Sequence, residues 1–149
     1  MKHLSVSNLV GFLYYFDRRM PPDYILRDGR ILHWKLGFDN ERMFTRYIKF
    51  EDELYEISGI PDKLDLKRGE VHELKTGKKL TERTKNYALD QVKIYSWLTG
   101  LWTFRVFFFY TGSRKLDEIA SGETNNEEVE ALIYDCLKRR REMQRLLKV

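Results

Sequence analysis

The chain has one cysteine among its 149 residues and no long apolar run. A single cysteine, Cys136, excludes an internal disulfide, a zinc finger and a protein-ligated iron–sulfur cluster. It favours a reducing intracellular compartment, so we expect a cytoplasmic protein. The longest apolar run, Leu101–Tyr110, covers ten residues and contains Arg105. This is about half of the length of a membrane-spanning helix, so we expect a soluble protein with no membrane partner.

Neither sign of charge dominates. The 27 Lys and Arg residues exceed the 23 Asp and Glu residues by four, which permits a polyanionic partner without requiring one. The charged fraction of 34% and the aromatic fraction of 14% exclude a disordered chain, a collagen-like repeat and a membrane bundle. The length favours a single domain, residues 1–149, which is large enough to bury a core without disulfides.

Hydrophobic periodicity predicts an α/β layered domain. Predicted helices cover residues 5–16, 28–36, 81–98 and 125–148. Predicted strands form a hairpin over residues 44–57, with its turn at 51–53, and two further strands at residues 69–75 and 102–110. The domain then divides into N-terminal helices (5–37), a core (44–112) and a C-terminal basic amphipathic helix (125–148).

Capping residues mark the ends of these helices. Ser5 or Ser7 can begin the first helix, while Gly37 and Gly100 can end the second and third. The run Thr124-Asn125-Asn126-Glu127 has the pattern of a capping box for the last helix. The strand at 102–110 is dense in aromatic residues and is expected to be central and buried on both faces.

Three charged residues stand out by position. Asp62 follows the proline that ends one strand, and Glu73 and Lys75 lie two apart on the next strand and so share one face. The ten intervening residues can return the chain so that Asp62 lies beside Glu73. Two converging carboxylates suit Mg²⁺ or Mn²⁺, and an adjacent lysine can neutralise charge developing on a phosphate. The alternative is a solvated strand face with a cross-strand ion pair.

Two further features adjoin these residues. Gln91 and Tyr95 are four apart on the following helix, which must pack on the sheet that carries Glu73. They are either substrate-orienting groups or ordinary helix positions. His33, in the apolar run Ile31–Trp34, is either a core histidine or a metal ligand.

These residues resemble the consecutive motifs of RecB-like nucleases in the PD-(D/E)XK superfamily, most closely the CRISPR-associated RecB-type exonucleases. The three motifs are Gly59-Ile60-Pro61-Asp62, Glu73-Leu74-Lys75-Thr76-Gly77 and Gln91-Val92-Lys93-Ile94-Tyr95. The similarity extends over about residues 4–112. It also includes Leu4–Leu9 with Phe12 and Arg18-Arg19, Gly29 with His33, and Trp102–Gly112.

The resemblance implies a restriction-endonuclease-like core, a central mixed sheet of about four strands flanked by helices. It implies that Asp62 and Glu73 bind Mg²⁺ or Mn²⁺ with His33 as a further ligand. Lys75 becomes the catalytic lysine, and Gln91 and Tyr95 orient the substrate or that lysine.

The implied activity is metal-dependent hydrolysis of DNA, by an exonuclease acting on single strands or ends. Two alternatives stay open: a structure-specific endonuclease that cleaves junctions or flaps, and a non-catalytic DNA-binding module on the same scaffold. Toroidal homo-oligomers suit processive nucleases, although no residue pattern here marks an interface.

The cysteines depart from the family. Many members hold a [4Fe–4S] cluster with one cysteine after the first helix and three near the C-terminus. Here Asp17-Arg18-Arg19-Met20 stands at the first position, and only Cys136 is near the end. An iron–sulfur cluster is therefore not expected.

Cations that follow the Glu73–Lys75 strand are the expected DNA contacts, and an aromatic ring beside them can stack on an unpaired base. These residues are Lys78, Lys79, Arg83, Lys85 and Tyr87. The basic run at 138–148 is either a solvated helix end or a second phosphate contact.

Overall fold

The computed structural model describes residues 1–14 and 31–147. In chain order it contains β1 (Lys2–Ser5), α1 (Val6–Tyr14), β2 (Phe44–Phe50), β3 (Glu53–Gly59), β4 (Lys63–Asp65), β5 (Glu70–Gly77), α3 (Glu82–Thr99), β6 (Thr103–Tyr110), β7 (Lys115–Glu123) and α4 (Asn126–Leu147). A helical turn also covers residues 31–35. The predicted positions Phe16, Arg18-Arg19 and Gly29, and the tetrapeptide at 17–20, lie outside the described residues.

The strands form two mixed sheets, so the chain is an α/β protein. The smaller sheet has the order β1-β3-β2 and the larger has the order β4-β5-β6-β7. In each sheet one neighbouring pair is parallel, β1 with β3 and β5 with β6. None of the described helices combines the length and the apolar character that a membrane crossing requires.

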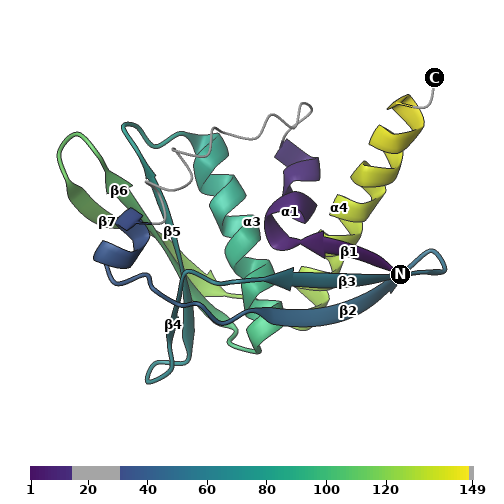
Figure 1. Ribbon diagram of the computed structural model, residues 1–149, viewed down its shortest axis with the longest axis horizontal. Coiled ribbons are helices and arrows are strands. Elements are labelled where there is room, and N and C mark those ends of the chain that lie inside the picture. The colour runs from purple at the N-terminus through teal and green to yellow at the C-terminus, as the bar shows by residue number, and fades with distance from the viewer. Residues whose placement is uncertain (15–30, 148–149) are drawn as a thin grey trace.

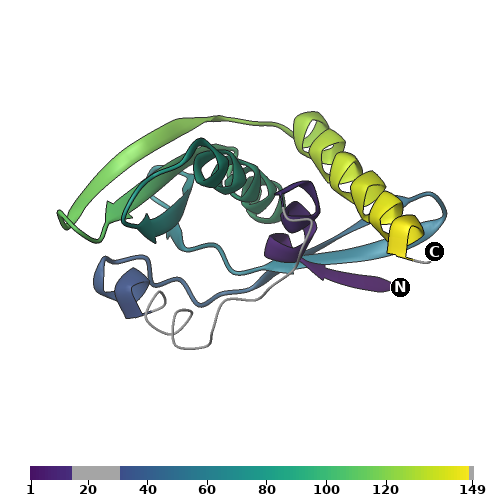
Figure 2. The same ribbon diagram turned by 90° about the horizontal axis from the view of Figure 1, so that it is seen from above.

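Helix α3 is the central element of the packing. It contacts β5 and β6 of the larger sheet and β2 and β3 of the smaller one. Figure 2 shows the larger sheet curving around α3, and both views place α1 between α3 and α4 (Figures 1 and 2). The fully buried side chains of α3, among them Val92 and Ile94, join both sheets into one core. The residues of α3 are therefore held firmly over the larger sheet.

The predicted hairpin is confirmed, with a shorter turn. Only Glu51 and Asp52 form the turn, and both have positive φ values, 46° and 66°. A two-residue turn with this backbone matches the twist of the two strands. Glu53, expected in the turn, begins β3 and pairs with Phe50.

The predicted helix ends are largely confirmed. Ser5 Oγ accepts a hydrogen bond from the amide of Asn8 at 3.1 Å and caps α1. Thr81 caps α3 through the amide of Thr84, and Gly100 ends that helix with φ of 77°. Gly37, with φ of 84°, follows the helical turn at 31–35 as expected.

The cap of α4 lies one residue later than predicted. Asn125 Oδ1, not Thr124, accepts the hydrogen bond of a helical amide, that of Glu128 at 2.8 Å. Thr124 instead donates its hydroxyl to the Glu128 carboxylate at 2.9 Å. An asparagine beside a threonine competes well for this role, because its side-chain oxygen reaches the same amides.

Three strands were not predicted: β1, β4 and β7. The first two are four and three residues long, too short to show an alternating pattern. Strand β7 is mostly exposed and polar, and it extends the larger sheet beyond the predicted core boundary at 112. Strand β6 is interior as predicted, but only one of its faces is fully buried, since Arg105 and Phe107 on the other face remain partly exposed.

Gly59 ends β3 where the chain passes against α1 and α3. A Cβ at this position would lie 2.7 Å from Tyr95 Cε1 and 2.8 Å from Val6 Cγ2. Glycine is therefore needed for the close approach of β3 to Tyr95.

We expect Gly59→Ala to lower the free energy of unfolding by about 1–3 kcal/mol, because the added methyl overpacks this contact. The matched control is Gly112→Ala, whose added Cβ would meet no atom within 4 Å. Urea denaturation of the two variants tests this, and equal stabilities would contradict the packing described.

Candidate active site

Asp62 directly precedes strand β4. The pairing of β4 with β5 begins at Lys63 and His72, and Pro61 cannot donate a further ladder hydrogen bond. The side chain of Asp62 replaces the missing partner, since Oδ2 accepts the amide of Leu74 at 2.8 Å. The predicted return of the chain is therefore confirmed, and Asp62 lies beside the strand that carries Glu73.

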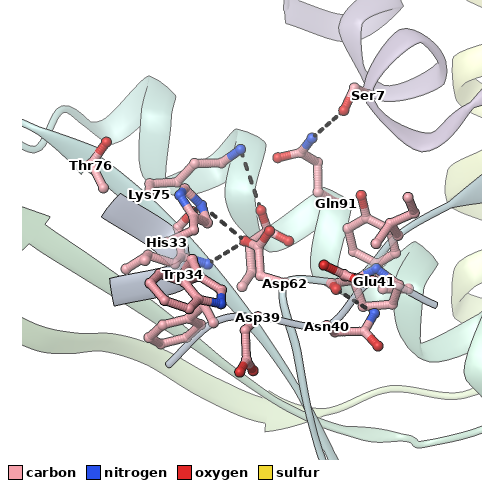
Figure 3. Close-up of a pocket in the computed structure, with 16 residues that line it drawn as sticks. Ser7, His33, Trp34, Asp39, Asn40, Glu41, Asp62, Lys75, Thr76 and Gln91 are labelled. Atoms are coloured by element: carbon pink, nitrogen blue, oxygen red, sulfur yellow. Dashed lines mark hydrogen bonds and ion pairs between the residues drawn. The ribbon is translucent and has the colours of Figure 1, made fainter. Parts of the chain in front are cut away.

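His33 reaches the same residue from the helical turn at 31–35. Its Nε2 donates to the carbonyl oxygen of Leu74 at 3.0 Å, because a carbonyl can only accept. The same nitrogen lies 3.5 Å from Asp62 Oδ2 (Figure 3). His33 is thus a half-buried side chain that already makes a hydrogen bond within the fold, and its role as a metal ligand stays a prediction.

Glu73 and Lys75 project from β5 on the face that α3 covers. Lys75 Nζ lies 3.4 Å from Glu73 Oε1, and only 5% of the Glu73 side chain is exposed. The second oxygen, Oε2, is buried without a hydrogen-bond partner among the described residues. Glu73 and Asp62 lie close enough to share a proton, so a protonated Glu73 can donate to the Asp62 carboxylate.

The two carboxyl groups differ in protonation. Burial of Glu73 and the negative charge of Asp62 raise the pKa of Glu73 well above its ordinary value, although Lys75 opposes this. Burial also acts on Asp62, but the hydrogen bond and charge of His33 and the amide of Leu74 outweigh it and lower its pKa. Asp62 is therefore ionised at neutral pH, and Glu73 tends to keep its proton.

Helix α3 contributes the predicted Gln91 and Tyr95. Both line one pocket of about 830 Å³ together with His33, Asp62 and Glu73. Burial, together with the nearby charges of Glu73 and Asp62, raises the pKa of Tyr95, so its hydroxyl stays protonated. Gln91 Nε2 donates to Ser7 Oγ at 3.2 Å, while its Oε1 is buried without a partner among the described residues.

The sequence did not predict several residues of the pocket, among them Ser7, Trp34 and Asn40. Ser7 holds the Gln91 amide (Figure 3). Asn40 fixes the segment that carries Asp62, because its backbone amide donates to Asp62 O at 3.1 Å and its Nδ2 donates to Pro61 O at 2.7 Å. No local pattern marks Ser7 or Asn40, since each acts on a residue more than twenty positions away.

The predicted DNA contacts lie around the β5–α3 connection, outside the pocket lining. Lys78, Lys79 and Arg83 are exposed, and Lys85 is half-buried. Tyr87 is not an open stacking surface, because Lys75 Nζ lies 5.0 Å from its ring centre and its hydroxyl donates to Ser7 O.

Cations of the C-terminal helix bind other parts of this chain. Arg141 pairs with Glu51, Arg140 donates to the Tyr55 hydroxyl, and Arg139 pairs with Glu142. Lys148 lies outside the described residues. These contacts involve three of the six cations of the run, so a solvated helix end and a phosphate contact both stay predictions.

A second acidic cluster lies on the opposite face of β5. Asp65, Glu70 and His72 bring their ligand atoms within 4.8 Å of one another. Arg105 Nε already donates to both oxygens of Glu70 at 3.0 Å and neutralises that carboxylate. This cluster is therefore a satisfied ion-pair network.

The residues of the pocket fit a hard divalent cation. Such ions prefer carboxylate oxygens, and Asp62 and Glu73 supply these from adjacent chain segments. When both carboxyl groups are ionised they repel each other, and a bound positive charge would offset that repulsion.

Comparison with known proteins informs the fold. No protein-family model matches this sequence, and no match was found among curated proteins. Among solved structures, the chain is similar to the crystal structure of SSO0001, with a TM-score of 0.73 and 21% identity. The similarity covers 97% of this chain and 77% of the other. At this identity the likeness shows a shared fold and nothing about activity.

The raised pKa of Glu73 makes stability depend on pH. The folded protein keeps a proton that the unfolded chain releases above its ordinary pKa of 4.5, so this group costs stability as the pH rises from 4.5 toward the raised pKa. Without divalent metal, we expect Glu73→Gln to be more stable than the natural protein at neutral pH, on the order of 1 kcal/mol.

Denaturation between about pH 4 and pH 8 in EDTA measures this effect. The advantage of Glu73→Gln must shrink toward the acidic end, where Glu73 is protonated in both states. A variant whose advantage is the same at every pH would show that Glu73 is ionised in the metal-free protein.

Proposed function

We propose that this chain is a metal-dependent deoxyribonuclease with a PD-(D/E)XK core of the RecB-like type. The observation that carries the proposal is the convergence of Asp62, Glu73 and Lys75 on one pocket, under the α3 residues Gln91 and Tyr95. The three sequence motifs lie in separate segments of the chain, and the residues that they single out line a common cavity. The α/β fold with a four-stranded mixed sheet is compatible with this class.

Asp62 and Glu73 would hold Mg²⁺ or Mn²⁺. His33 would be a further ligand only in the tautomer that carries its proton on Nδ1, since the Nε2 that now donates to Leu74 O must lose its hydrogen before it can ligate. When bound, the ion supplies Lewis acidity and a water of lowered pKa. Asp62 is already ionised, and Glu73 must release its proton for ligation. The proposed cofactor therefore binds more tightly as the pH rises.

Lys75 provides positive charge on the face where phosphate would lie. Its Nζ lies 3.4 Å from Glu73 Oε1, and the side chain is partly exposed. The ammonium group can therefore reorient toward a phosphate in the pocket while the backbone stays in β5. A fixed cation there stabilises the charge that develops on the phosphate during hydrolysis. Gln91 has a side-chain amide held by Ser7, which gives it a defined orientation toward the pocket.

The preferred substrate is single-stranded DNA or DNA ends, acted on by an exonuclease. This preference comes from the resemblance to RecB-type exonucleases. The two alternatives are cleavage of junctions or flaps and DNA binding without catalysis.

We expect Asp62→Ala, Glu73→Ala and Lys75→Ala each to lower cleavage of end-labelled DNA at least about 100-fold with Mn²⁺ or Mg²⁺, because each removes a charge from the reacting centre. Lys49→Ala, an exposed lysine on β2, is the matched control and should keep full activity. EDTA should abolish cleavage by the natural protein.

Comparison of linear single strands, blunt duplexes and four-way junctions then separates the activities. Preferred cleavage of junctions would replace the exonuclease with a structure-specific endonuclease. If Mn²⁺ gives neither cleavage nor a rise in melting temperature, the chain is a non-catalytic binding module.

A second prediction concerns Lys78 and Lys79, the exposed pair next to the Glu73–Lys75 strand. We expect the Lys78→Ala/Lys79→Ala variant to bind DNA more weakly, with the slope of log affinity against log salt reduced by about 1.5, as two phosphate contacts require. The double variant Lys2→Ala/Lys49→Ala removes the same charge from the smaller sheet and should leave the slope unchanged. Fluorescence anisotropy of labelled DNA over a range of salt measures both.

A further inference from the structure

Trp34 is the largest exposed aromatic side chain of the pocket. It directly follows His33, and 67% of its surface is accessible. No aromatic ring or cation covers its face among the residues that the structure describes. An indole left open beside charged groups is unusual for a side chain whose usual place is the core.

The helical turn at 31–35 explains why Trp34 is exposed. Leu32 and Leu36, on the other side of this turn, pack on Phe38, Leu74 and Phe109. The turn thus contributes its apolar residues to that cluster and leaves Trp34 outside it. The apolar packing of this turn among the described residues therefore does not involve the Trp34 ring.

Other aromatic rings at the site are occupied. Tyr95 is 7% exposed and Phe38 is likewise buried, while Tyr87 lies under Lys75 Nζ. Among the described residues that line the pocket, Trp34 (labelled in Figure 3) is therefore the exposed aromatic side chain. A second exposed apolar side chain, Ile60 at 47% accessibility, lines the same pocket two residues before Asp62.

We infer that Trp34 is a stacking platform for an unpaired nucleobase next to the phosphate held at Asp62, Glu73 and Lys75. The inference rests on the proposed nuclease function and assigns the residue that would hold a base of its single-stranded substrate. Bases within a duplex have both faces covered by their neighbours, so only an unpaired or terminal base can reach the indole. Stacking on an aromatic ring is tolerant of sequence, which suits a nuclease without sequence preference.

Binding is tested with a short oligothymidylate in Ca²⁺, by quenching of tryptophan fluorescence. Stacking on Trp34 should quench its emission. Trp97 is 2% exposed, and the emission of the partly exposed Trp102 is measured separately in Trp34→Phe. Trp34→Ala should bind the oligonucleotide about tenfold more weakly or worse, and Trp34→Phe should keep most of the affinity. Tyr47→Ala, which removes an exposed aromatic ring from β2, is the matched control and should bind normally.

Cleavage is measured in Mn²⁺ on a single strand and on a blunt duplex of the same sequence. Trp34→Ala should cleave the single strand about tenfold more slowly or worse, with a much smaller effect on the duplex. Because Trp34 is exposed, melting temperatures should match, and Trp34→Phe provides a second folded variant.

Unchanged oligothymidylate binding by Trp34→Ala, or an equal loss on both DNA forms, would overturn the stacking role. In that case cleavage by the natural protein and its loss in Lys75→Ala would leave the proposed function standing. Conversely, quenching that depends on Trp34 in a protein that cleaves no DNA would support the platform and refute the nuclease.

Discussion

The pairing of strand β5 with β4 stops before Leu74, and two side chains make the hydrogen bonds of the Leu74 backbone on that edge. Pro61 ends the pairing with β4, and the backbone polar groups that follow must still be satisfied. Asp62 accepts the Leu74 amide and His33 donates to its carbonyl. One interruption of a ladder therefore brings a carboxylate and an imidazole together, although they lie in chain segments separated by nearly thirty residues.

The pocket also concentrates unfavourable electrostatics. Glu73 is nearly fully buried beside an ionised carboxylate, and Lys75 compensates only part of this cost. Such an arrangement persists because the surrounding core holds it in place: α3 joins both sheets above β5. By contrast, the Glu70–Arg105 pair on the opposite face is fully compensated. The two faces of β5 thus carry two different carboxyl groups. Glu73 faces the pocket, and Glu70 on the other face forms an ion pair that stabilises the sheet.

Patterns within one segment were readable from the sequence. Helix α3, its glycine cap and the hairpin of β2 and β3 follow from periodicity and turn residues, and the spacing of Asp62, Glu73 and Lys75 follows from strand alternation. Contacts between distant segments were not readable, which is why Ser7 and Asn40 were missed. Trp34 was overlooked because an apolar run around His33 suggests burial, whereas a single helical turn can bury only one side. Strand β7 was not predicted because its stability comes from pairing with β6 rather than from its own composition.

Leu74 also serves the other face of the sheet, where its side chain packs with Phe38 and Phe109. The segment at 31–38 therefore packs in this small cluster and also lines the pocket. Local opening of that segment would release His33 and Trp34 together while the main core stays folded, as one cooperative unit. A ligand that contacts both residues would disfavour this opening, so occupancy of the pocket and order in residues 31–38 are thermodynamically linked.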